Sequence, residues 1–79
     1  MTKFWLVLLI FGRISGAAMT PADEAYCEAR RAIEEPRARR ILVDREWNGW
    51  LVRPGDVEVA CVPYRNGKQP RPGGNLRRT

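Results

Sequence analysis

The amino-acid sequence predicts a small α+β domain, in which one N-terminal helix packs on a three-stranded antiparallel β-meander and a single disulfide joins the two. Three observations lead to this fold class: an apolar stripe at helical spacing in residues 20–35, two turn signals between short β-rich runs in residues 41–62, and a single pair of cysteines. A chain of 79 residues allows one domain, and a core of that size is marginally stable. We therefore expect a covalent constraint.

The first 18 residues have the three parts of a secretory signal peptide. Lys3 gives a positive start, Phe4 to Phe11 form an unbroken apolar run, and Ser15 to Ala18 are small residues at the spacing that signal peptidase recognises. We therefore expect cleavage before Met19 and a secreted or periplasmic mature protein, with residues 19–64 as its folded domain.

Two other interpretations of this segment stay open. One is an uncleaved leader that anchors the protein to a membrane, although Arg13 interrupts the apolar run well before the roughly 20 residues that a spanning helix needs. The other interpretation is a buried strand or helix of a cytoplasmic protein. It is disfavoured because the run stands at the extreme terminus and has no polar alternation.

The segment after the leader predicts a helix from Thr20 to about Glu35. Thr20 is the expected N-cap, and Pro21 takes the first helical position, where its missing N–H costs nothing. Apolar side chains recur at spacings of three and four along one face: Ala22, Ala25, Tyr26, Ala29, Ala32 and Ile33. Pro36 is expected to end the helix because it cannot donate a backbone hydrogen bond.

The predicted strands are Ile41 to Trp47, Trp50 to Arg53 and Val57 to Val62. Asn48-Gly49 is typical of a type I′ hairpin turn, and Pro54-Gly55 is typical of a type II turn. If both are two-residue loops, one face of the meander becomes apolar. That face comprises Ile41, Val43, Trp47, Trp50, Val52, Val57, Val59 and Cys61. The two tryptophans are therefore expected mainly in the core.

The two cysteines are predicted to form a disulfide. Cys27 lies at the margin of the helical stripe and Cys61 on the buried face of the third strand. Export would place both in an oxidising compartment, where such a pair in a small domain is typically bridged. A loop of this length closed by a disulfide is worth about 4 kcal/mol in the chain-entropy model. Without export, both thiols would be reduced and packed as small hydrophobes.

The net charge of +5 is unevenly distributed. Residues 22–64 contain nine acids and seven bases, whereas residues 65–79 contain five bases and no acid. This last segment has no apolar periodicity, and its three glycines and two prolines are typical of a disordered tail. Its cations are candidates for binding an anionic surface: Arg65, Lys68, Arg71, Arg77 and Arg78.

The composition argues against catalysis. The chain has no histidine, and no serine follows the leader, so a Ser-His or Cys-His nucleophile cannot be assembled. Two cysteines alone supply too few ligands for zinc. The carboxylate pairs Asp44/Glu46 and Glu34/Glu35 are interpreted as an exposed sheet face and a helix end beside arginines. We expect no enzymatic activity, cofactor or metal.

Export, small size and the lack of catalytic groups favour a protein that acts by binding an envelope or extracellular partner, as an inhibitor, immunity or exclusion factor. The candidate contact residues lie at the predicted hairpin: Trp47, Trp50, Arg45 and Arg53. One alternative is a cationic surface-active protein that binds anionic lipid or envelope polyanions through its tail. Another, if the leader is misread, is a cytoplasmic nucleic-acid-binding protein that stacks bases on the tryptophans. The partner and the oligomeric state stay open.

Overall fold

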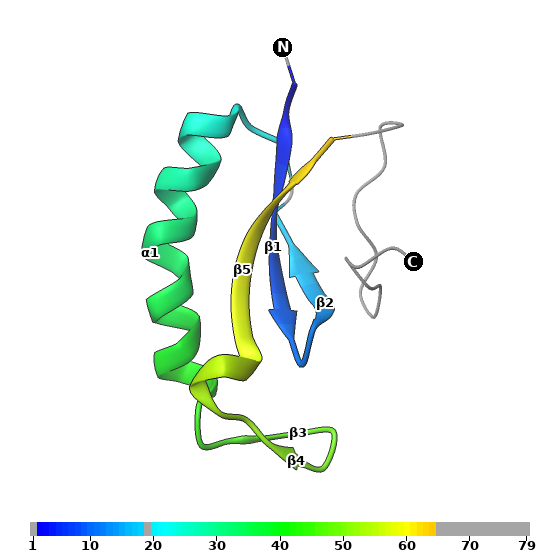
Figure 1. The fold of residues 1–79 in the computed structure, drawn as a ribbon, viewed down its shortest axis with the longest axis vertical. Coiled ribbons are helices and arrows are strands. Elements are labelled where there is room, and N and C mark those ends of the chain that lie inside the picture. The colour runs from blue at the N-terminus through cyan, green and yellow to red at the C-terminus, as the bar shows by residue number, and fades with distance from the viewer. Residues whose placement is uncertain (1, 19, 65–79) are drawn as a thin grey trace.

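The apolar N-terminal run forms the central strand of a sheet in the computed structural model, which describes residues 2–18 and 20–64. Strands β1 (Phe4–Ile10) and β2 (Arg13–Ala17) make an antiparallel hairpin. Phe11 and Gly12 join them with φ angles of 54° and 78°, as a type I′ turn requires. Strand β5 (Val57–Pro63) pairs with the other side of β1, so the strand order is β2-β1-β5 (Figure 1).

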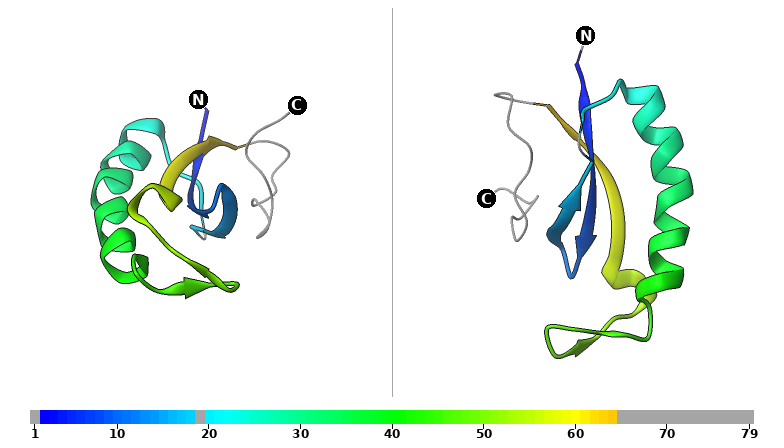
Figure 2. Two further views of the ribbon diagram at one scale, coloured as in Figure 1. Left: turned by 60° about the horizontal axis from the view of Figure 1, so that its bottom comes forward. Right: turned by 180° about the vertical axis from the view of Figure 1, so that it is seen from behind.

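Helix α1 (Glu24–Leu42) packs along one face of this sheet, mainly against β5 and β1 (Figures 1 and 2). The predicted fold class is therefore confirmed: one helix on a three-stranded antiparallel sheet, in a mixed α+β arrangement. The identity of the strands differs from the prediction, and each difference has a local cause.

The helix begins later than predicted. Asp23 is the N-cap, and its side chain accepts a hydrogen bond from the backbone N–H of Tyr26 at 2.8 Å. Thr20 cannot serve as the cap because the chain beside it is extended: Phe4 and Ala22 exchange backbone hydrogen bonds of 2.7 and 2.9 Å. The assignment of Thr20 as N-cap was thus wrong, since a partner far along the sequence holds this segment.

The prediction that Pro36 ends the helix was also wrong. Proline removes only one backbone hydrogen bond from the helix interior, and the turns that follow it are anchored by packing. Ala38 and Leu42 pack against a buried cluster formed by Ile10, Val52 and Val57. Most helical stability in proteins comes from such tertiary contacts, and here they carry the helix past the proline.

The predicted meander is not formed. The Asn48-Gly49 turn is present, with φ angles of 54° and 85°, and Trp47 pairs with Trp50 as expected. However, strands β3 (Glu46–Trp47) and β4 (Trp50–Leu51) form a separate two-stranded hairpin. A short 3₁₀ turn, η1 (Pro54–Asp56), replaces the predicted type II turn.

Strand β5 pairs with β1 instead of β4. The pairing runs over seven residues, from Phe4 opposite Pro63 to Ile10 opposite Val57. β1 offers a longer and more apolar partner than the two-residue β4, so β5 buries more apolar surface this way.

The core lies on both faces of β1. Towards the helix, Ile10 packs with Val52 and Val57. On the opposite face a second buried cluster contains Trp5, Val7, Leu9 and Ile14. A strand that is buried on both faces has a continuous apolar sequence, which explains why Phe4–Ile10 shows no polar alternation.

Of the four valines on the predicted core face, Val52, Val57 and Val59 are buried, as expected, and Val43 is half-buried. Ile41 and Trp50 are not, with exposed fractions of 59% and 71%. Ile41 lies in the last turn of α1 rather than in a strand, and Trp50 lies in a hairpin that extends beyond the end of the sheet (Figure 1).

The predicted disulfide is present. It links Cys27 of α1 to Cys61 of β5, across a Cα–Cα distance of 6.1 Å. Cys27 is buried, and Cys61 lies opposite Leu6 of the central strand. The bridge therefore pins the helix to the sheet, as the sequence indicated.

The segment that resembles a signal peptide supplies two of the three strands of the main sheet. A chain starting at Met19 would keep both cysteines but only β5 of that sheet. Signal peptidase cleavage stays a prediction. Within the described residues, no helix is long and apolar enough to cross a membrane. The predicted disordered tail, residues 65–79, lies outside the described residues.

Candidate functional site

An apolar groove separates the two hairpin turns of the molecule. One wall is the turn between β1 and β2, and the other is the tip of the β3–β4 hairpin. The groove has a volume of about 580 Å³, within the usual range for ligand-binding clefts. Its lining residues are Ile10, Phe11, Arg13, Ile14, Ser15, Trp47, Asn48 and Trp50.

Three exposed aromatic side chains line the groove. Trp50 is 71% exposed, and Phe11 and Trp47 are 38% and 37% exposed. The tight turns at Phe11-Gly12 and Asn48-Gly49 present these side chains on two facing hairpins. The interpretation of both tryptophans as core residues was wrong, because the meander that would have covered them is not formed. Clustered exposed aromatic residues are typical of contact surfaces.

The base of the β3–β4 hairpin is fixed to the core. The N–H of Asp44 donates to the carbonyl of Val52 at 2.9 Å, and the N–H of Val52 donates to the carbonyl of Arg45 at 2.9 Å. The Val52 side chain is fully buried. The tryptophan wall is therefore anchored to the core at its base, although its aromatic side chains are exposed.

The four sequence-predicted contact residues do not form one site. Trp47 and Trp50 line the groove, whereas Arg45 and Arg53 are exposed outside its lining. The backbone N–H of Arg53 donates to the carboxylate of Asp56 at 2.9 Å, which fixes the start of η1. Arg13 is instead the single charged residue among those that line the groove.

The groove wall formed by the β1–β2 turn was not predicted from the sequence, because its residues, among them Phe11 and Arg13, were assigned to a leader. The signal that could have revealed them is Phe11-Gly12, a pair with the turn-forming glycine between two runs of β-forming residues.

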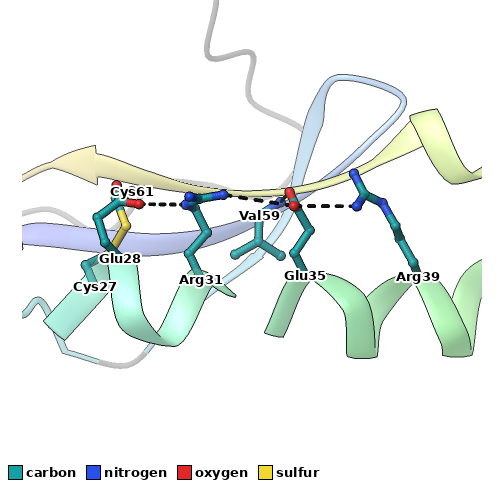
Figure 3. A network of polar contacts seen from close by, with 7 residues as sticks. All are labelled: Cys27, Glu28, Arg31, Glu35, Arg39, Val59 and Cys61. Atoms are coloured by element: carbon teal, nitrogen blue, oxygen red, sulfur yellow. Dashed lines mark hydrogen bonds and ion pairs between the residues drawn. A yellow bond between two sulfur atoms is a disulfide. The ribbon is translucent and has the colours of Figure 1, made fainter. Parts of the chain in front are cut away.

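A second polar arrangement lies along the outer edge of β5 (Figure 3). Arg31 contacts the carboxylates of Glu28 at 2.8 Å and Glu35 at 3.9 Å, and Arg39 contacts Glu35 at 3.5 Å. Glu35 also accepts a hydrogen bond from the backbone N–H of Val59 at 3.0 Å. The hydrogen bond and charge of Glu28 raise the pKa of Arg31, which stays protonated.

This network is interpreted as structural rather than as a contact patch. Its arginines are held by helical neighbours at i−3, i+4 and i−4, and its central carboxylate satisfies a backbone donor of the sheet. On the same helix, Glu34 pairs with Arg30 and Arg37. Such exposed pairs each contribute little to stability.

The described part of the chain contains no group of three or more histidine, cysteine, aspartate or glutamate residues that could hold a metal ion. The tail cations that were predicted to bind anionic surfaces lie outside the described residues. No family model, curated protein or solved structure matches the chain. The function of the groove must therefore be inferred from the residues that line it.

Proposed function

We propose that this protein binds another protein through the groove between its two hairpins, in an envelope or extracellular compartment, and catalyses no reaction. The observation that carries the proposal is Trp50, which is 71% exposed and stands beside Trp47 and Phe11 on a disulfide-closed scaffold. Tryptophan is among the residues that contribute most to protein interfaces. Inhibitors, immunity factors and exclusion factors are the classes of protein that act in this way.

The attachment of both walls to the core supports a binding role. The Phe11 wall continues directly into β1, the central strand of the sheet. The Trp47 wall is fixed through the buried Val52. A preorganised surface loses less conformational entropy on association and therefore binds more tightly for the same contacts.

The Cys27–Cys61 bridge supports an oxidising compartment. Because Phe11, Arg13 and Ile14 line the groove, the proposed binding form keeps residues 1–18. Cleavage before Met19 would remove one wall of the site together with two strands of the sheet.

The test is capture of a partner by chemical crosslinking. The full-length, disulfide-bonded chain is incubated with the envelope fraction of its source cells, in parallel with Trp50→Ala and Leu51→Ala variants. Leu51 is the matched control because it is the next residue, is 51% exposed and does not line the groove. We expect the same partner with the wild-type and Leu51→Ala proteins and its loss with Trp50→Ala. Equal capture by all three would contradict the proposal.

The two other functions weighed from the sequence can be tested in the same experiment. The groove lining contains one cation, Arg13, whereas single-stranded nucleic acid is usually bound along a basic groove with stacking aromatic residues. Anionic vesicles and a single-stranded oligonucleotide are added as competitors. Neither is expected to displace the crosslinked partner. Displacement by the oligonucleotide with a steep salt dependence would favour nucleic-acid binding instead.

A further inference from the structure

The two edges of the sheet differ in how their backbone groups are satisfied. At the β5 edge, the N–H of Val59 is bound by Glu35, and Arg31 and Arg39 flank that carboxylate (Figure 3). Helix α1 thus covers this edge. Coverage by a helix and charged side chains is how proteins prevent a sheet edge from pairing with another chain.

The β2 edge is organised differently. Leu8 pairs with Gly16, and the N–H of Ala18 donates to the carbonyl of Leu6 at 2.8 Å. Ala17, opposite Val7, lies between these two hydrogen-bonded positions. In an antiparallel ladder such an intermediate residue directs its N–H and C=O away from the partner strand. Ala17 therefore presents a donor and an acceptor to the outer side of β2.

Among the described residues, no strand pairs with that outer side, since the sheet ends at β2. The β2 sequence, Arg-Ile-Ser-Gly-Ala, lacks the lysine or proline that commonly protects an edge strand. Its register shift falls between the pairs Leu8–Gly16 and Leu9–Ile14, so the irregularity lies at Ser15 and leaves the ladder around Ala17 regular. Extended segments bind such edges by adding a strand, with main-chain hydrogen bonds for affinity and side-chain pockets for specificity.

The edge leads directly into the groove described above. Arg13, Ile14 and Ser15 belong to β2 and also line the groove, opposite Trp47 and Trp50. A segment that pairs with β2 would therefore carry one of its side chains to the exposed indoles. Arg13, as the single charge of the lining, would meet the same segment.

We propose that the partner contributes an extended peptide segment, which adds to β2 as a fourth strand and places a large apolar side chain between the tryptophans and Phe11, with a carboxylate beside Arg13. This inference rests on the proposed function and names the chemistry of the partner. A second copy of the chain fits less well, because its own β2 contains an arginine and no acid, so pairing β2 with β2 would leave Arg13 without a counter-charge.

The probe is a phage-displayed library of random 12-residue peptides, selected on the full-length, disulfide-bonded protein. The enriched peptides are expected to combine an acidic residue with a large apolar one. An Arg13→Gln variant should bind them several-fold more weakly. Absence of enrichment over the unselected library, or equal binding by Arg13→Gln, would overturn the assignment.

The decisive variant is Ala17→Pro. It removes the outward N–H and leaves the hydrogen bonds of Gly16 and Ala18 with β1 intact, and edge strands accept proline at such a position. Ala17→Val is the matched control, since it has a similar volume and keeps the N–H. Isothermal titration should show about tenfold weaker binding for Ala17→Pro, the loss of one hydrogen bond. Ala17→Val should bind like the wild type.

A second measurement keeps the inference testable if Ala17→Pro does not fold. The selected peptide is N-methylated at its odd or at its even positions, and each form is titrated against the wild-type protein. Strand addition predicts that one set abolishes binding and the other does not.

If both sets bind equally well while Trp50→Ala weakens binding, strand addition is wrong and the proposed function stands. If Trp50→Ala also binds normally, both fail. A dimer in sedimentation that Ala17→Pro disrupts would show self-pairing and overturn the peptide assignment.

Discussion

Removal of the first 18 residues should abolish the fold, even though both cysteines remain. The truncated chain, residues 19–79, loses five buried side chains: Trp5, Val7, Leu9, Ile10 and Ile14. Burial of each is worth about 1.5–3 kcal/mol, so the loss is roughly 8–15 kcal/mol, as large as the total stability of a typical domain at about 5–15 kcal/mol. Val57 and Val59 would also lose the strand that they pair with.

The assay is thermal unfolding of oxidised residues 19–79, followed by near-UV circular dichroism beside the full-length chain. We expect a cooperative transition for the full-length protein and none for the truncated one. Addition of a synthetic peptide of residues 1–18 should restore the transition, which separates loss of a structural strand from a defect of purification. A cooperative transition of the truncated chain at a similar temperature would refute the assignment of β1 as the central strand.

Three further changes test the bridge and the helix. Replacing both Cys27 and Cys61 by alanine should lower the free energy of unfolding by about 4 kcal/mol and the melting temperature by roughly 15–30 °C; a decrease of only a few degrees would mean that the bridge adds little. Pro36→Ala supplies the backbone N–H that proline lacks inside the helix. It should raise the free energy of unfolding by about 1–3 kcal/mol, seen as a higher urea midpoint; an unchanged midpoint would contradict this. Asp23→Ala removes the cap of the Tyr26 N–H and should cost about 1 kcal/mol in the same titration, with Asp23→Asn near the wild type. Equal losses in both variants would point away from capping.

The fold class and the bridge were predictable because their signals are local or covalent. The apolar stripe of the helix, the Asn48-Gly49 turn and the two cysteines each depend on residues close in sequence or on a single pair. The helix, the turn and the bridge are present in the structure. The predicted stripe, however, does not face the sheet, because the helix packs through Cys27, Ala38 and Leu42. The stripe residues within the helix are exposed: Ala25, Tyr26, Ala29, Ala32 and Ile33. The strand pairing was not predictable in this way, because it joins Phe4–Ile10 to residues more than 45 positions later.

The N-terminal run allows two interpretations for a physical reason. A strand that is buried on both faces and the apolar core of a signal peptide have the same sequence pattern, since neither needs polar alternation. Once the run was assigned to a leader, the remaining strands had to pair with one another, and Trp47 and Trp50 were placed in the only apolar face available. With β1 in the sheet, β5 has a better partner, and the tryptophans are left exposed beside Phe11.

The most direct test is the intact mass of the protein isolated from its source cells, measured with a thiol-alkylating reagent before and after reduction. If the N-terminal hairpin belongs to the working fold, the mass will include residues 2–18, and alkylation will add nothing before reduction and two groups after it. A mass that corresponds to a chain starting at Met19 would contradict the retained strand. Two alkylated thiols in the unreduced protein would contradict the bridge.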